Sequence, residues 1–219
     1  MRDEFAKAAR LMARKALKGA LATTDTDTGG PYASMILLAT TVDGSPITLI
    51  SGLARHTRNL SRSAAASILI DTSDHSGDPT TGGRLSLVGR FGKDASAPVR
   101  SRFLRRQPQA AGYADFADFE FWRMEIDSAH FIEGFGRIVT LPGTAMGVAF
   151  EDAADFSIAE ATHSPALRQR WPALTGFDCE GVDLLIGAQP GRLTFDHAAP
   201  NFEMAQAAAA KCLGTMPPT

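Results

Sequence analysis

The hydrophobic residues of this chain follow two different periods, and each period predicts a different kind of element. Near the N-terminus, apolar residues recur three or four positions apart, which is typical of one face of an amphipathic helix. This face consists of Phe5, Ala8, Ala9, Met12 and Ala16. From residue 20 to 141 the chain instead shows short apolar runs separated by Gly, Pro, Asp and Ser, which indicates a β-rich region.

The apolar runs in the β-rich region have the length of strands. They cover 20–24, 32–41, 46–51, 66–71, 84–91, 119–126 and 130–141, the last two lying around Asp127 and Ser128. Asp43-Gly44 supplies a hairpin signal, and short helices are expected at 57–63 and, with basic side chains, at 98–107. Strands at hairpin spacing with few long helices favour an antiparallel barrel or sandwich over a parallel sheet.

A second, smaller region follows, and we expect domain boundaries at 1–145 and 150–219. Its sequence predicts one helix, a hairpin and a final Ala-rich helix at 200–213. The hairpin joins Val182–Ile186 to Leu193–His197 through a turn at Gln189–Gly191. The glycines of the GFGRIV segment, 134–139, do not make a dinucleotide site, because the third glycine and a surrounding βαβ unit are missing. They mark a bulge or a close backbone approach.

Charge and cysteine content exclude several classes of protein. The chain has 22 Lys and Arg against 24 Asp and Glu, a net charge of −2, which argues against nucleic acid as a partner. No apolar run approaches the roughly 20 residues of a membrane span, and the N-terminus lacks the apolar core of a signal peptide. The two cysteines, Cys179 and Cys212, form no metal or disulfide motif. A reduced, cytoplasmic protein with both cysteines buried is expected.

The segment LISGLARHTRNL, residues 49–60, carries the strongest chemical signal. A strand ends at Ile50, and Ser51 and Gly52 break it. Arg55, His56, Thr57, Arg58 and Asn59 follow at once. A strand-to-helix turn of this kind gathers backbone N–H groups, hydroxyls and guanidinium groups, which suits a phosphate. The alternative is a solvated helix start with surface arginines.

Several segments together resemble a known family. They are GALATTDTDTGGPYASMILLAT, DGSPITLISGLARHTRNL, ASILID, RLSLVGRF, the block at 119–125 and AHFIEGFGRI. This pattern is similar to the pyridoxamine 5′-phosphate oxidase-like FMN-binding split barrels, and more narrowly to the HugZ-type haem-utilisation branch. The resemblance implies an α+β fold that is mainly β with flanking helices. It implies a six-to-seven-stranded antiparallel split β-barrel followed by a small α/β C-terminal domain, here divergent.

The resemblance also implies a cofactor site. In this family FMN lies in a groove between the two subunits of a homodimer. The positions that match are Ser34, Met35, Ser51, Arg55, His56, Thr57, Arg58, Asn59 and Arg84. Ser34 and Ala39 stand where the oxidase itself has Arg and Lys, so the phosphate would meet fewer cations. The match assigns no catalytic residue and no metal.

A haem-binding function requires an axial ligand to the iron, usually His, which we expect near the C-terminus. His197 is the first candidate and His163 the second, and the alternative for each is a surface or capping histidine. His163 stands alone in a segment where the branch usually has an Asn-x-Asp-His-like sequence. We expect His75 to be exposed and His130 to be structural.

Three functions therefore remain open. The first is an FMN-dependent oxidoreductase acting on an unidentified small molecule. The second is a haem-binding or haem-degrading protein. The third is a degenerate, non-catalytic ligand-binding protein that keeps the fold.

The strand sequences also bear on assembly. The run 35–38 lacks alternation, and Phe119, Phe121 and Trp122 crowd neighbouring positions. Strands that are apolar on both faces need a cover on each side. We therefore expect a homodimer, with the C-terminal region folding back over the strands as the alternative cover.

Overall fold

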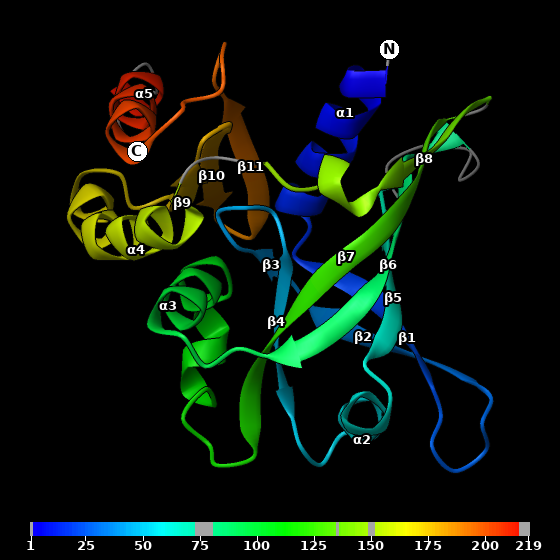
Figure 1. The fold of residues 1–219 in the computed structure, drawn as a ribbon. Helices are drawn as coiled ribbons and strands as arrows, with labels where there is room; N and C mark the ends of the chain where they lie inside the picture. Colours follow the sequence, from blue (N-terminus) through cyan, green and yellow to red (C-terminus); the bar gives the residue numbers. More distant parts are fainter. Residues whose placement is uncertain (1, 73–80, 135, 149–151, 215–219) are drawn as a thin grey trace.

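The computed structural model describes residues 2–72, 81–134, 136–148 and 152–214, and its main feature is a strongly curled antiparallel sheet (Figure 1). Helix α1 (Arg2–Lys15) precedes it. The strands are β1 (Lys18–Thr24), β2 (Pro31–Leu37), β3 (Ala39–Thr40), β4 (Pro46–Ser51), β5 (Ala65–Asp71), β6 (Arg84–Lys93), β7 (Phe119–Gly134) and β8 (Arg137–Pro142). Their order is β2-β1-β5-β6-β7-β4-β3, with β8 paired to β7. The predicted antiparallel split barrel is confirmed.

The interior of the barrel is closed at one end by α1. The helix places Ala6, Ala9 and Ala13 against the sheet, where they join the barrel core. Leu21, Ile68, Leu85, Leu87 and Met124 of that core are fully buried. These residues alternate with exposed ones along their strands, which is why the sequence pattern located the strands.

The other side of β4 and β7 is covered by helix α3 (Ala97–Arg106) and the short helix η3 (Pro108–Gly112). Val99, Phe103 and Ala110 pack there against Leu49 and Phe121, and the rings of Phe103 and Phe121 meet edge to face at 5.7 Å. The expectation that Phe121 and Trp122 need a partner chain or the C-terminal region as cover is therefore wrong. Both are buried within this chain, Phe121 under α3 and Trp122 in the barrel core.

A second sheet follows in the last third of the chain. It contains β9 (Leu174–Asp178), β10 (Gly181–Ile186) and β11 (Gln189–Thr194) in the order β11-β10-β9. Helices α4 (Ala153–Arg170) and α5 (Phe202–Gly214) pack with it around Leu174, Phe177 and Val182. The described helices include none that is long and apolar enough to cross a membrane.

Several details of the predicted elements were wrong. The two strands expected around Asp127 and Ser128 are one continuous strand, β7, whose pairing with β6 shifts by one residue at Val88/Gly89. The chain reverses instead near Gly134 and Gly136, both at positive φ. In the second sheet the hairpin turns at Gly187, two residues before the expected Gln-Pro-Gly, because Gly187 supplies the positive φ that a tight turn requires.

The cysteine prediction was half right. Cys179 is buried, and burial raises the pKa of its thiol to about 12. Cys212 is only partly buried.

Buried ion pairs connect the two sheets. Arg14 of α1 and Arg102 of α3 reach Asp178 and Asp183 of the second sheet, and Arg105 pairs with Glu160 of α4 at 2.6 Å. Within the second sheet, Arg192 pairs with both aspartates. These seven residues, with Arg106, have side chains that lie almost entirely out of solvent. The basic helix predicted at 98–107 is confirmed as α3, and its arginines 102, 105 and 106 are buried.

Candidate functional site

The segment with the strongest chemical signal forms the expected strand-to-helix turn. Strand β4 ends at Ser51, and helix α2 (Arg55–Arg62) begins four residues later with Ala54 at its N-cap. Ala54 provides no side-chain cap, so the first N–H groups of α2 keep the capacity to bind an anion. Figure 1 shows α2 at the end of the barrel away from the second sheet.

His56 joins this turn to the neighbouring strand. Its Nδ1 lies 3.0 Å from Ser34 Oγ of β2. Its Nε2 is buried and has no hydrogen-bond partner among the described residues, and the same holds for Thr57 Oγ1 one residue later. Burial lowers the pKa of His56 below its usual value. A buried ring nitrogen and hydroxyl without partners indicate a place where a ligand can bind.

Three of the predicted residues already have internal partners. The Arg55 Nε donates to Asp25 Oδ2 at 2.5 Å, and its guanidinium lies over the Tyr32 ring. The hydrogen bond from Arg55 lowers the pKa of Asp25, and the bond to Asp25 raises the pKa of Arg55. Ser51 Oγ donates to Asp118. Asn59 Nδ2 donates to Thr23 Oγ1 at 2.9 Å.

The remaining predicted residues lie in different places, some at the surface near the turn and one far from it. Arg58 and Met35 are exposed, Met35 by 63% on the outer side of β2. Arg84 lies far from the turn. Strand β5 starts just after α2, and its first residue, Ala65, pairs with Arg90 of β6. Arg84 pairs with Asp71, at the opposite end of β5. Ser34, Arg55, His56, Thr57 and their neighbours thus form one cluster, and Arg84 lies outside it.

The histidine candidates for haem differ in their surroundings. His197 lines a cavity of about 390 Å³ between α1 and the segment after β11. Ala8, Leu11 and Phe195 give this cavity apolar walls, and Lys7 gives it a cation. We call it the α1 cleft.

The other histidines lie elsewhere. His163 is exposed on α4, with its ring on Phe202 and its Nδ1 2.8 Å from the Ala159 carbonyl oxygen. His130 is exposed on β7, 3.2 Å from Thr140 Oγ1. His75 lies outside the described residues.

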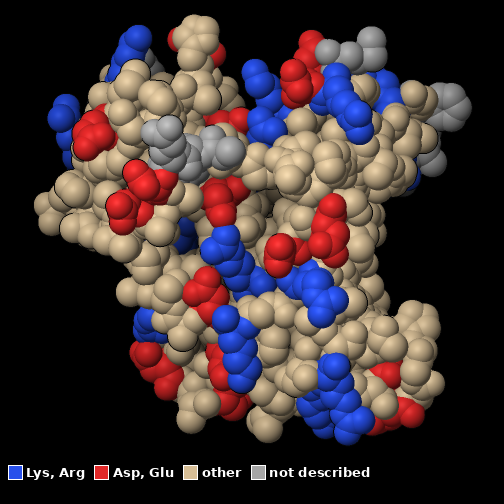
Figure 2. Space-filling view, viewed as in Figure 1, with Lys and Arg blue, Asp and Glu red and all other residues tan. Residues whose placement is uncertain are grey.

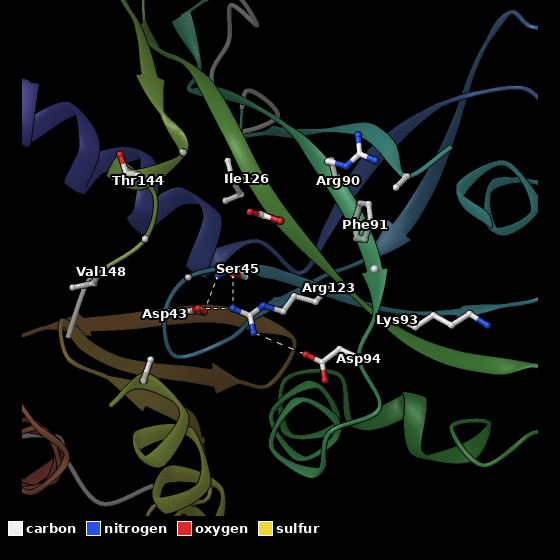
Figure 3. Close-up of a pocket in the computed structure, with 17 residues that line it drawn as sticks. Asp43, Ser45, Arg90, Phe91, Lys93, Asp94, Arg123, Ile126, Thr144 and Val148 are labelled. Atoms are coloured by element: carbon white, nitrogen blue, oxygen red, sulfur yellow. Dashed lines mark hydrogen bonds and ion pairs between the residues drawn. The ribbon is translucent and has the colours of Figure 1, made fainter. Parts of the chain in front are cut away.

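Sequence reasoning missed the most spacious of the cavities described here. A groove of about 870 Å³ lies on the outer side of β6 and β7, and its lining includes Arg90, Arg123 and Glu125 (Figure 3). The alternation along β6 does predict that Arg90 points away from the barrel core. No local pattern shows that a loop from residues 43–45 and a segment from 143–148 wall off the space beside it.

Comparison with known proteins agrees with the barrel described above. The family model for the CREG beta-barrel matches residues 1–145. The chloroplastic heme oxygenase HOZ of Arabidopsis thaliana is 37% identical over 111 residues, which cover 48% of this chain. The match spans about a third of that relative's length, 33%.

Two solved structures match the chain over nearly its whole length. A protein of unknown function from Agrobacterium tumefaciens has a TM-score of 0.78 at 23% identity, covering 95% of this chain and 94% of its own. A heme binding protein from Mycobacterium smegmatis has a TM-score of 0.62 at 24% identity, covering 96% of each chain. A protein of the pyridoxinephosphate oxidase family shares the barrel more distantly, with a TM-score of 0.50.

The fold and its relatives define the class of protein. It is an antiparallel split barrel of the kind found in haem proteins and in pyridoxamine phosphate oxidase-like proteins. The chain belongs to the CREG beta-barrel family.

Proposed function

We propose that this protein binds haem, with His197 as the axial ligand in the α1 cleft. The observation that carries the proposal is that an exposed imidazole without a partner among the described residues lines a cavity with apolar walls. A volume of about 390 Å³ is within the usual range for small-molecule sites. The names of the Arabidopsis and Mycobacterium relatives support haem as the ligand.

The donor set of the cleft fits a haem. Neutral imidazole nitrogen is a common axial ligand for haem iron. The apolar side chains of Leu11 and Phe195 suit the face of the macrocycle, and the Lys7 ammonium suits a propionate. When bound, haem would supply the redox chemistry, and the chain would hold and orient it.

A haem titration tests this proposal. We expect a shifted Soret band in the wild type, its loss in His197→Ala, and its retention in His163→Ala. The proposal is overturned if the two variants bind haem equally well. If haem binds through His197, ascorbate in air with added catalase then tests for degradation. Loss of the Soret band under those conditions would support a haem-degrading enzyme.

FMN is the second candidate ligand, and its proposed binding site is the turn at the start of α2. It is favoured by His56 Nε2 and Thr57 Oγ1, which are buried without partners beside an uncapped helix start. These groups, with the exposed Arg58, fit a phosphate. Arg55 fits less well than expected, because Asp25 already neutralises part of its charge. An oxidoreductase activity through FMN, on a small molecule of unknown identity, rests on this binding.

An FMN titration followed by flavin fluorescence tests the second candidate. We expect Thr57→Val together with His56→Ala to weaken binding by about 1.5–3 kcal/mol for each charge-assisted hydrogen bond lost. His197→Ala serves as the matched control and should leave FMN binding unchanged. Binding of haem alone would remove FMN from consideration, and binding of FMN alone would do the same for haem.

We also propose that the protein is a homodimer. Its outer face, defined by Ala20, Met35, Leu69 and Val88, carries exposed apolar side chains on four adjacent strands of the sheet, β2, β1, β5 and β6. A second copy of the same face is the natural cover for such a surface. The domain boundaries at 1–145 and 150–219 and the cytoplasmic location stay predictions.

A further inference from the structure

The groove on the outer side of β6 and β7 has walls from several parts of the chain. They include the last residues of β6, residues 123–126 in the first half of β7, the turn at Asp43–Ser45, the segment Gly143–Val148, and Ala153 at the start of α4. None of the positions predicted for FMN lines it, nor does His197. Figure 2 shows basic and acidic side chains side by side in a hollow at the centre of this face. The groove is therefore a separate candidate site of mixed charge.

The walls of the groove are held in place by internal contacts. Arg123 donates to Asp43 Oδ2 and, at 3.1 Å, to Ser45 Oγ, and its second amino group lies 4.0 Å from Asp94 (Figure 3). The backbone also packs closely: a Cβ on Gly143 would stand 1.7 Å from the Ile126 carbonyl oxygen. The groove is thus formed before any ligand arrives, which lowers the entropy cost of binding.

Two opposite charges in the groove have no partner in the described part of the chain. Arg90 and Glu125 are exact Cα partners across β6 and β7, and both line the groove. Opposite charges in that position commonly pair, yet no ion pair joins them. Around them, Lys93 pairs with Glu120 at 2.8 Å and Arg123 pairs with Asp43. The structure therefore leaves one cation and one anion available side by side.

The groove also has apolar surface. Ile126 and Val148 line it and are partly buried. A ligand that uses all of these features carries an anionic group for Arg90, a cationic group for Glu125 and an apolar body. We propose that the groove binds a small zwitterionic molecule of this kind, with an ammonium and a carboxylate group close together on an apolar frame. The site goes beyond haem or FMN binding and does not depend on either.

Three matched probes test the proposal: L-phenylalanine, 3-phenylpropanoate, which lacks the ammonium group, and phenethylamine, which lacks the carboxylate. Binding to the full-length protein is followed by amide NMR shifts. We expect L-phenylalanine to bind about three- to tenfold more tightly than either fragment, as partly exposed charged contacts allow. The largest shifts should fall on residues of β6, β7 and 143–148. No binding of any probe at 10 mM, or shifts confined to other parts of the chain, would overturn the proposal.

Two variants test the contribution of each charged residue on its own. Arg90→Gln should abolish the advantage of L-phenylalanine over phenethylamine, and Glu125→Gln should abolish its advantage over 3-phenylpropanoate. Both residues are exposed, so neither change should disturb folding, which the dispersion of the amide spectrum checks. Arg62→Gln on α2 and Glu203→Gln on α5 are the matched controls and should bind as the wild type does. If the groove variants and the controls lost equal affinity for L-phenylalanine, the assignment of Arg90 and Glu125 to the binding site would be contradicted.

Discussion

Arg14 of α1 and Asp178 of β9 form an ion pair 164 positions apart in the chain, with 2.9 Å between Nη1 and Oδ2. Their side chains are 1% and 0% exposed. Arg192 also pairs with Asp178, at 2.7 Å. Burial acts to raise the pKa of Asp178, but these two guanidinium groups, together with that of Arg102, outweigh burial and hold the pKa well below its usual range. The first helix is thereby tied to the second sheet.

Replacing Asp178 by Asn should destabilise the protein strongly. The variant keeps the shape of the side chain but leaves Arg14 and Arg192 buried with less opposite charge. Breaking a buried pair from one side costs about 3–5 kcal/mol. Urea unfolding measures this change. The exposed pair of Arg100 and Asp115 gives the control: Asp115→Asn should change the free energy of unfolding by about 0–1 kcal/mol. Similar values for both variants would contradict the prediction.

Acid should destabilise the wild type through the same aspartate. Because the folded-state pKa of Asp178 is lowered, its contribution to stability is complete above the unfolded value of about 3.9. The contribution is then lost as pH falls below that value. Urea unfolding at pH 3 and pH 6 should show a smaller acid-induced loss in Asp178→Asn than in the wild type. An equal loss of unfolding free energy in both proteins would show that groups other than Asp178 cause the acid destabilisation.

The arginines also show where sequence reasoning fails. The segment VRSRFLRR, residues 99–106, predicts a helix correctly, because its apolar residues Val99 and Phe103 recur at helical spacing. It does not predict that Arg102, Arg105 and Arg106 are buried. The carboxylates and carbonyl groups that compensate them lie 55 to 92 residues away. A pattern within one helix carries no information about such distant partners.

The cluster at the α2 turn could be predicted in part. The spacing of residues 49–60 gave the strand, the turn and the helix start, since Ser51 and Gly52 end an apolar run. The resemblance selected Ser34, which does meet His56. What could not be predicted was the competition for these side chains. Asp25, 30 residues before Arg55, takes up that guanidinium, and Asp118 takes up Ser51.

His56 should make FMN binding dependent on pH. Burial keeps its pKa below the usual value in the free protein, and a phosphate beside Nε2 would raise it. Binding would then take up a proton, so FMN should bind more tightly at pH 6 than at pH 8. Each unit of pKa shift corresponds to about a tenfold change in affinity.

NMR of the His56 ring with and without FMN measures the pKa shift directly. Because phosphate itself takes up a proton near pH 6, the comparison is with His56→Gln, in which only the phosphate titrates. The same pH dependence of affinity in the wild type and in this variant would rule out the role of His56.

Two glycines of β6 should respond very differently to a methyl group. At Gly89, where the register shifts, a Cβ would stand 1.9 Å from the Glu125 carbonyl oxygen, which is part of the rigid backbone. At Gly92 nothing lies within 4 Å. Gly89→Ala should therefore cost about 1–3 kcal/mol or more, and Gly92→Ala should stay within about 0.5 kcal/mol. Thermal unfolding of the two variants compares them, and equal melting temperatures would show that β7 moves aside freely.

Charges on the outer face should separate the proposed dimer. Met35 and Leu69 are 63% and 43% exposed, and both pair with Ala20 across β1, so they lie in one row on the same side of the sheet. A lysine there would have to lose water in the interface, and its partner across a twofold axis would carry the same charge. The double variant Met35→Lys and Leu69→Lys should therefore be monomeric.

Light scattering at low micromolar concentration checks the assembly. The wild type should have twice the chain mass of 23.3 kDa, and the double variant should have the chain mass itself. Met204→Lys is the control, because Met204 is similarly exposed, at 54%, but lies on α5 away from the barrel. A wild type at the single-chain mass would exclude the dimer. It would also exclude an FMN groove shared between subunits, while haem in the α1 cleft of a single chain would be unaffected.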